Sequence, residues 1–430
     1  MRYSGVEWIG NIPDNWTLDR LQWHIDEIKE SNDPVQTKQV LSLTNKLGVV
    51  PYEEKGEQGN KAKENVNEYK LAYPNTIVAN SMNILIGSVG KCNYFGCVSP
   101  VYYVFKPKTN ENIDFLNYIF QSTQFQKELR KYANGILEIR LRVSADDILK
   151  RQVALPSTEE QQKIVSLLNK KSAEIDSLIE VENQQIEKLK EYKQSVITEA
   201  VTRGLDPTVP MKDSGVEWIE KIPEKWTIQK VLNQLIMPIT DGPHTTPELF
   251  SEGVAFVSAE AVSCGNGSID FNHIRGFISE TFYQECCLKY TPEIDDVYMI
   301  KSGATTGRVS IVTTLEPKFT IWSPLAVMRC DKRKMFPRFL FYALQSVHFQ
   351  RQVALGWSFG TQQNLGMRAL EQLKLLVPDL ESQKAIYEYL DTKLSEIDGA
   401  LKIKESKIKN LEEYKKSMIY EYVTGKKEVV

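Results

Sequence analysis

The sequence predicts a mixed α/β chain: two α/β globular domains separated by two long helices that pack as an antiparallel coiled coil, with a pseudo-two-fold internal repeat. Two observations lead to this fold class. Segments 4–17 and 214–227 match at ten of 14 positions, and segments 155–204 and 377–426 match at 19 of 50. Both long segments also carry an apolar seam with a mean spacing of about 3.5 residues, which is typical of coiled coils. The chain therefore presents one architecture twice.

The repeat sets the order of the blocks along the 430 residues. A weaker sequence repeat lies inside the globular segments. Ten of the 29 positions in 98–126 match at an offset of 224, which indicates a shared framework that carries different loops. The predicted blocks are a short block 1–17, a first globular domain 18–154, a central helical region 155–227, a second globular domain 228–376 and a C-terminal helical region 377–430.

The two helical regions are expected to form a spacer. A helix of about forty residues spans roughly 60 Å. A solvated surface helix is the simpler alternative, but duplication of the whole seam argues against it. The predicted seam residues are Ile175, Ile179, Glu182, Ile186, Leu189, Lys193 and Val196 in the first helix, and Ile397, Leu401, Lys404, Ile408, Leu411, Lys415 and Met418 in the second.

The globular segments combine strand-like runs with one helix each. The helices are expected near 112–132 and 336–354. Glycine and proline breaks are dense around the strands. The strand-like runs are 75–89, 97–105, 255–262, 296–300, 309–313 and 325–329.

Composition and charge restrict the possible functions. The hydrophobic fraction of 42% and the charged fraction of 25% are ordinary for a globular protein. The sequence shows neither a membrane-length apolar run nor a signal pattern at its start, and its six cysteines favour a reducing cytoplasm. A net charge of −3 gives no whole-molecule argument for nucleic-acid binding. The globular segments 18–155 and 228–376 are nevertheless the less acidic parts, at +2 and +1.

Motifs that would carry catalysis are absent from the sequence. It contains no phosphate-binding loop, dinucleotide-binding glycine motif or serine elbow, and its four histidines lack zinc-site spacing. The segment 405–407 spells a nuclease-like E-x-K, but it lies on the predicted coiled coil. A binding or scaffolding protein is therefore expected rather than an enzyme.

The repeated block S-G-V-E-W-I-x-x-I-P-x-x-W resembles the DNA-specificity subunit of type I restriction–modification systems, and the resemblance covers essentially the whole chain. Segments 240–247 (TDGPHTTP), 301–307 (KSGATTG) and 360–365 (GTQQNL) are similar to segments of that family's recognition domains. The first globule departs from this pattern in the matching places, with 86–91 and 134–142. Different loops on one framework imply two different half-sites.

The resemblance implies a non-catalytic targeting role. Such a subunit binds double-stranded DNA and gathers two methyltransferase (modification) subunits and the restriction/translocase subunits. S-adenosylmethionine, ATP and Mg are expected on those partners, and no cofactor is expected on this chain. The target is expected to be bipartite and asymmetric, with one recognition domain for each half-site and a spacer set by the helices. Because the blocks are cyclically arranged, the start of the chain is expected to meet the second long helix.

Candidate DNA contacts follow from side-chain chemistry, because Arg favours guanine and Gln or Asn favours adenine. For each single arginine, an ordinary surface role is the alternative, and turn hydrogen bonding is the alternative for the histidine. The base-reading candidates are Lys91, Arg140 and Arg142 in the first domain and His244, Thr245, Arg308, Gln362, Gln363 and Asn364 in the second; the phosphate candidates are Lys127, Arg130 and Lys131 on one helix.

Four tryptophans of the short blocks have two interpretations. Trp8, Trp16, Trp218 and Trp226 are candidates for partner binding, since tryptophan is enriched at interface hot spots. Alternatively, they pin the short blocks onto the long helices of the same chain.

Three other functions stay open at this point: an orphan specificity subunit without restriction, a coiled-coil adaptor without a DNA role, and an enzyme with a site between the globules. Two copies of the chain could also associate when the partners are missing, since the seams are self-compatible.

Overall fold

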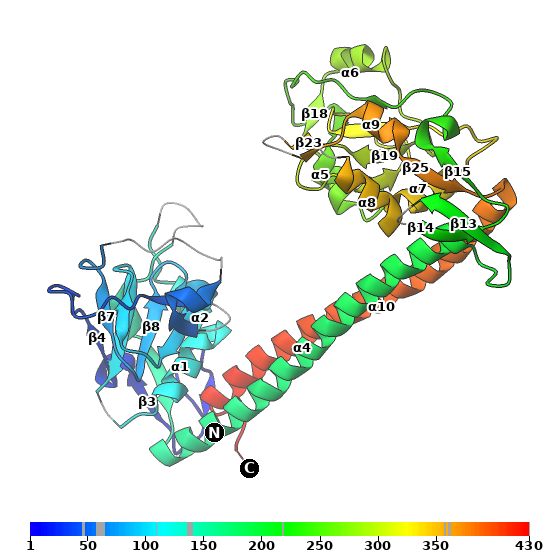
Figure 1. Cartoon of the computed structure of the whole chain (residues 1–430). Helices are drawn as coiled ribbons and strands as arrows, with labels where there is room; N and C mark the ends of the chain where they lie inside the picture. The colour runs from blue at the N-terminus through cyan, green and yellow to red at the C-terminus, as the bar shows by residue number, and fades with distance from the viewer. Residues whose placement is uncertain are drawn as a thin grey trace. The chain divides into compact units, whose positions relative to one another are not determined.

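The computed structural model divides into two compact units (Figure 1). Unit 1 comprises Met1–Asn183 and Glu405–Val430, and unit 2 comprises Gln184–Lys404. Each unit holds one globular domain and a part of both long helices. The structure describes residues 1–44, 48–56, 65–108, 110–135, 141–216, 219–356, 358–359 and 363–429.

The long helices are α4 (Thr158–Arg203) and α10 (Leu380–Val423). Within each unit they run side by side in opposite directions, since the partner numbers on one helix fall as those on the other rise (Figure 1). In unit 1, Nζ of Lys415 lies 2.7 Å from Oδ1 of Asp176. In unit 2, Nζ of Lys193 lies 2.6 Å from Oδ1 of Asp398. The predicted antiparallel coiled coil is confirmed.

The seam holds its charged members by pairing them. Every predicted seam residue is buried or half-buried. The Glu182 carboxylate is buried, and its Oε1 lies 2.6 Å from Nζ of Lys407, whose side chain reaches solvent. A buried carboxylate is tolerated when a cation compensates it.

The first globular domain is built on a four-stranded antiparallel sheet. Helices α1 and α2 pack against it, and α3 lies near the end of the domain. The sheet has the order β4 (Ile25–Ile28), β11 (Tyr102–Pro107), β8 (Thr76–Asn80), β9 (Val89–Cys92); two further pairs are β5 (Leu41–Thr44) with β6 (Gly48–Pro51) and β7 (Lys70–Ala72) with β10 (Gly96–Val98); the helices are α1 (Ile113–Gln121), α2 (Thr123–Arg130) and α3 (Ala145–Leu149).

The second globular domain contains a sheet with the same pattern of four antiparallel strands, which is the shared framework that the weaker sequence repeat predicts. This domain also contains a three-stranded sheet with one parallel pair. The first sheet has the order β16 (Thr240–Asp241), β22 (Leu325–Met328), β19 (Val297–Ile300), β20 (Val309–Ile311); the second has β18 (Phe277–Ile278), β17 (Val254–Val257), β21 (Phe319–Ile321); the helices are α5 (Ala259–Cys264), α6 (Glu280–Cys287), α7 (Pro337–Gln345), α8 (Val347–Leu355) and α9 (Met367–Gln372).

The prediction of one helix near 112–132 and one near 336–354 is wrong in detail, because each is two helices. Ser122 and Ser346 break them, with extended backbone angles at the junction. The hydroxyl of Ser346 caps α8 by accepting from the N–H of Phe349 at 3.3 Å. The strand expected over 255–262 also changes to helix α5 after Val257.

Paired strands close each globular domain where the chain enters and leaves it. β3 (Thr17–Arg20) pairs with β12 (Gln152–Leu155), which leads into α4. In unit 2, β15 (Thr227–Lys230) pairs with β25 (Lys374–Val377), which leads into α10. Each domain therefore starts and ends at one place.

A hairpin precedes each domain. In unit 1 it is β1 (Arg2–Tyr3) with β2 (Asn11–Ile12), and in unit 2 it is β13 (Met211–Val216) with β14 (Ile219–Pro223). The first hairpin packs on the end of α10, where the hydroxyl of Tyr420 donates to the carbonyl oxygen of Trp8 at 3.0 Å. This contact confirms that the start of the chain meets the second long helix (Figure 1).

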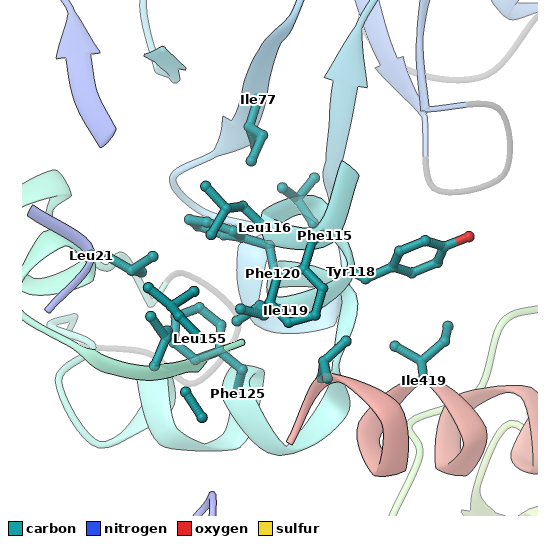
Figure 2. Close-up of a cluster of buried hydrophobic side chains, with 14 of the residues drawn as sticks. Leu21, Ile77, Phe115, Leu116, Tyr118, Ile119, Phe120, Phe125, Leu155 and Ile419 are labelled. Atoms are coloured by element: carbon teal, nitrogen blue, oxygen red, sulfur yellow. The ribbon is translucent and has the colours of Figure 1, made fainter. Parts of the chain in front are cut away.

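The core of unit 1 joins these parts. Phe115, Ile119 and Phe120 of α1 lie between the sheet and the helices, and Ile419 of α10 reaches the same cluster (Figure 2). The hydrophobic effect therefore fixes the domain to the helix pair within the unit. Within the described residues, no helix is long and apolar enough to cross a membrane.

Candidate nucleic-acid interface

In the second domain, a glutamine of α8 holds the turn between β19 and β20. Nε2 of Gln350 donates to the carbonyl oxygens of Gly307 at 2.9 Å and Leu344 at 2.6 Å. Gly307 has a φ of +94°, and a Cβ there would collide with Gln350. The turn therefore needs glycine at this position, and it presents the next residue, Arg308, at the surface.

Asp241 of β16 fixes a second segment beside this turn. Its buried Oδ2 lies 3.3 Å from Nζ of Lys301 and 3.1 Å from Nε2 of His244, and its Oδ1 pairs with Lys289. Burial alone would raise the pKa of Asp241, but Lys289 and Lys301 outweigh burial and hold the pKa below its ordinary value. The carboxylate stays charged and ties segment 240–247 to the turn that begins at Lys301.

A third segment reaches the same place through the backbone. β24 (Gln363–Asn364) pairs with β23 (Ser358–Phe359), and Asn364 also bridges to Ser302. The N–H of Leu365 donates to the carbonyl oxygen of Lys301 at 2.7 Å. The three polar segments that the sequence predicts as DNA-contacting therefore converge in the described part of this domain.

The first domain has a matching turn between β8 and β9. The N–H of Asn80 donates to the carbonyl oxygen of Ser88 at 3.0 Å, as Ile300 does to Arg308 at 2.9 Å in the second domain. Gln126 lies against Gly87, as Gln350 lies against Gly307. The turn 81–88 therefore corresponds to 301–308.

The segment that meets this turn in the first domain carries an arginine in an isolated β-bridge. The N–H of Val143 donates to the carbonyl oxygen of Ser81 at 3.3 Å, as Leu365 does to Lys301. Arg142 exchanges two backbone hydrogen bonds with Asn134, and its Nη2 donates to Sδ of Met82 at 3.5 Å. Both domains thus present an exposed polar side chain, Arg142 or Asn364, immediately before a buried apolar residue.

Comparison with known proteins identifies this architecture. The model of the type I restriction modification DNA specificity domain matches the chain twice, over residues 24–191 and 252–425. The chain belongs to this family. Membership confirms the predicted resemblance.

Curated specificity subunits are similar to the chain over a large part of its length. It is 27% identical over 304 residues to the putative type I restriction enzyme MjaX specificity subunit of Methanocaldococcus jannaschii, and 26% identical over 282 residues to the type I restriction enzyme MjaVIII specificity subunit of the same organism. These matches cover 70% and 64% of this chain, and 65% and 62% of the relatives' own lengths. The chain therefore spans somewhat less than two thirds of each relative.

A solved structure from work on complex assembly and conformational transition of the type I R-M system has the same fold. It superposes with a TM-score of 0.70 at 14% identity, covering 96% of this chain and 98% of that chain. At this identity the likeness concerns the fold alone.

Within the first specificity domain, an ion pair already explains Lys91. This residue lies on β9, and its Nζ is 2.8 Å from Oδ2 of Asp114 in the first turn of α1. The side chain is partly buried between strand and helix. The structure thus gives Lys91 a packing role that needs no DNA.

The predicted phosphate contacts on α2 differ in their surroundings. Lys131, just beyond the helix, pairs with Glu7 at 2.8 Å and Glu128 at 2.9 Å, and hydrogen bonds to these two carboxylates raise its pKa. Lys127 and Arg130 are exposed and make no ion pair with a described residue. The latter two are the cations of this helix that are available to phosphates.

In the second specificity domain, three candidates stand at the surface. His244 is 73% exposed although it pairs with Asp241, and Thr245 follows it in the same segment. Nη1 of Arg308 donates to the carbonyl oxygen of Ser263 at 3.0 Å, and its side chain remains exposed. Arg140, Gln362 and Trp218 lie outside the described residues, as does the side chain of Gln363.

The described tryptophans of the short blocks pack inside the chain. Trp8, Trp16 and Trp226 are only 7%, 2% and 6% exposed. The rings of Trp8 and Phe125 are tilted against each other with centroids 5.2 Å apart, and Nε1 of Trp16 donates to Glu160 of α4 at 3.0 Å. The buried rings pack the short blocks within their own chain, as the alternative interpretation expects, and partner binding by these tryptophans stays a prediction.

Sequence reasoning missed the residues that support the interface from behind. Gln126 and Gln350 are matching positions of the weaker sequence repeat, and this match is the signal by which they could have been predicted. Asp241 and Lys301 leave no such signal, because 60 residues separate the partners. Among the described side chains, no group of His, Cys, Asp and Glu could hold a metal ion.

Proposed function

We propose that this chain is the DNA sequence-recognition subunit of a type I restriction–modification complex. It reads a bipartite, asymmetric target with one recognition domain for each half-site. The observation that carries the proposal is the convergence of three polar segments on one framework in the second domain, with different side chains on the matching turn and strand of the first. A scaffold without a DNA role gives no reason for such divergence.

The recognition domains are proposed to span 18–154 and 228–376. The chain passes between them within α4 and α10, which are uninterrupted helices of 46 and 44 residues. We propose that this pair sets the length of the spacer between half-sites.

The partners are proposed to be two methyltransferase subunits and the restriction/translocase subunits. S-adenosylmethionine, ATP and Mg would bind to those partners, and this chain would hold none of them. The duplicated hairpins and helix ends supply two similar surfaces for two copies of one partner. Cytoplasmic action is supported by the six cysteines, which are all free thiols.

The decisive experiment is a methylation map. The chain is expressed with its neighbouring methyltransferase in a host that lacks the modification, and native DNA is sequenced for methyladenine. A single asymmetric bipartite motif is expected. Replacement of either recognition domain should change one half of the motif and leave the other half unaltered.

Two outcomes would contradict the proposal. A stable complex with the methyltransferase but no new motif would indicate a coiled-coil adaptor. A motif that does not depend on either recognition domain would show that the partner alone selects the target. A motif without restriction of unmodified DNA would identify an orphan specificity subunit, which leaves target reading in place.

A further inference from the structure

The two recognition domains place different side chains at one equivalent position. Val143 and Leu365 are both fully buried, and the N–H of each donates to the residue that opens the matching turn, Ser81 or Lys301. Each buried side chain anchors its segment on the turn. The preceding residue in each domain is exposed, so its side chain faces outward.

The preceding residues carry the chemistry that reads bases. Arg142 presents a planar guanidinium with a fork of donors, and Asn364 presents an amide with one acceptor and two donors. In the major groove, Arg binds the O6 and N7 acceptors of guanine, and Asn binds the N6 donor and N7 acceptor of adenine. The two pairings use the same base edge and differ only in donor and acceptor pattern.

The neighbour on the turn also differs in kind. Arg142 lies against the thioether of Met82, and Asn364 bridges through its backbone to Ser302. The residues of the turn and of the facing segment therefore differ together between the two domains, as expected of a pair that sets specificity.

We infer that residues 142 and 364 are the equivalent specificity-determining positions of the two recognition domains, with Arg142 selecting a guanine in one half-site and Asn364 an adenine in the other. This inference rests on the proposed function and adds to it the base class that each domain selects.

The test maps methylation with full-length variants in the assembled modification complex. Arg142→Ala should relax one position in the half-site of the first domain, which is a guanine on one strand in the parent motif. Asn364→Ala should relax one position in the other half-site, an adenine on one strand. At each relaxed position, preference for the parent base should fall roughly 5- to 150-fold.

Conservative variants separate base reading from folding. Arg142→Lys keeps the positive charge but loses the bidentate fork, so it should relax the same position while the complex still assembles. Lys150→Ala in the first domain and Arg351→Ala on α8 of the second remove exposed cations that are not among the candidate DNA contacts. These two controls should leave the base preference at every position unchanged.

The outcomes distinguish the inference from the proposed function. If the parent complex, without substitutions, methylates no bipartite motif, the proposed function is overturned. A parent motif that keeps every position in Arg142→Ala and Asn364→Ala would overturn the inference alone, as would a relaxed position that is neither guanine for Arg142 nor adenine for Asn364.

Discussion

The backbone N–H of Asn112 donates to Oε1 of Gln161 at 2.8 Å, although 49 residues separate them. The same bond recurs in the second copy, where Phe336 donates to Oε1 of Gln383 at 2.7 Å. Both glutamines are fully buried near the starts of α4 and α10. Each one links its long helix to the start of a helix in its recognition domain. The same hydrogen bond therefore joins domain and long helix in both copies.

Replacing Gln161 with Ala should destabilise unit 1. Nε2 of Gln161 also donates to the carbonyl oxygen of Pro156 at 3.1 Å, so the change leaves more than one buried backbone group unpaired. The cost should be about 1–3 kcal/mol. Gln162→Ala is the matched control, because Gln162 is exposed. Thermal unfolding of the two variants measures the difference, and equal midpoints would contradict the role of Gln161.

Asp296→Asn should destabilise the second domain strongly. The buried carboxylate accepts from Nε and Nη2 of Arg329 at 2.7 and 2.8 Å and from the hydroxyl of Tyr290 at 2.5 Å. Removing one charge of such a pair costs about 3–5 kcal/mol. Glu293 pairs with the same Arg329 but is 62% exposed, so Glu293→Gln should cost no more than about 1 kcal/mol. Denaturant unfolding of both variants tests the order, and a larger loss from Glu293→Gln would refute it.

Two glycines of the C-terminal region should respond to alanine in opposite ways. Gly425 has a φ of +68°, and a Cβ there would overlap Pro13 of the N-terminal block. Gly425→Ala should therefore loosen the N-terminal hairpin and lower stability. Gly399 lies in α10 with open space around it, so Gly399→Ala should add about 0.5–1 kcal/mol. Hydrogen exchange of residues 1–17 reports the hairpin, and unchanged protection in Gly425→Ala would be the contrary result.

Stability should fall at alkaline pH through Cys330. Burial, followed by the charges of Asp295 and Asp296, raises the pKa of this thiol to about 12 from an ordinary value of 9.0. The pKa of the thiol is therefore higher in the folded state than in the unfolded state. For this reason its contribution to the free energy of unfolding is complete below about pH 9 and is lost as pH rises toward 12. Cys330→Ala should flatten the decline of unfolding free energy in that window. A thiol reagent at pH 8 should modify exposed Cys264 well before Cys330, and equal rates would contradict this burial.

Lys127→Ala combined with Arg130→Ala should weaken DNA binding without changing its sequence preference. Both cations are exposed on α2 without an ion pair to a described residue. Each lost phosphate contact should reduce the slope of log affinity against log salt by about 1. Lys131→Ala serves as the comparison, since its two carboxylate partners already neutralise it. A salt titration of the assembled complex on specific and random duplexes measures the slopes.

Periodic and repeated features were predictable from the sequence. Ile186 and Val196 fall on a 3.5-residue seam, and the structure buries both of them. The break of the α1–α2 helix at Ser122 was not predictable, since apolar spacing continues across it and tertiary packing decides the backbone angle. Nor was the pairing of Lys91 with Asp114, because contacts between distant elements leave no periodic trace.

The paired strands that open and close each recognition domain, β3 with β12 and β15 with β25, have a consequence for how such genes change. Because a domain begins and ends on adjacent hydrogen-bonded strands, its whole coding segment is a cassette with two neighbouring joints. Recombination at those joints would replace the recognition domain and keep both long helices in the reading frame. Under the proposed function, a lineage that carries such a gene can acquire a new half-site in one genetic event, without passing through point mutants that recognise neither the old nor the new target.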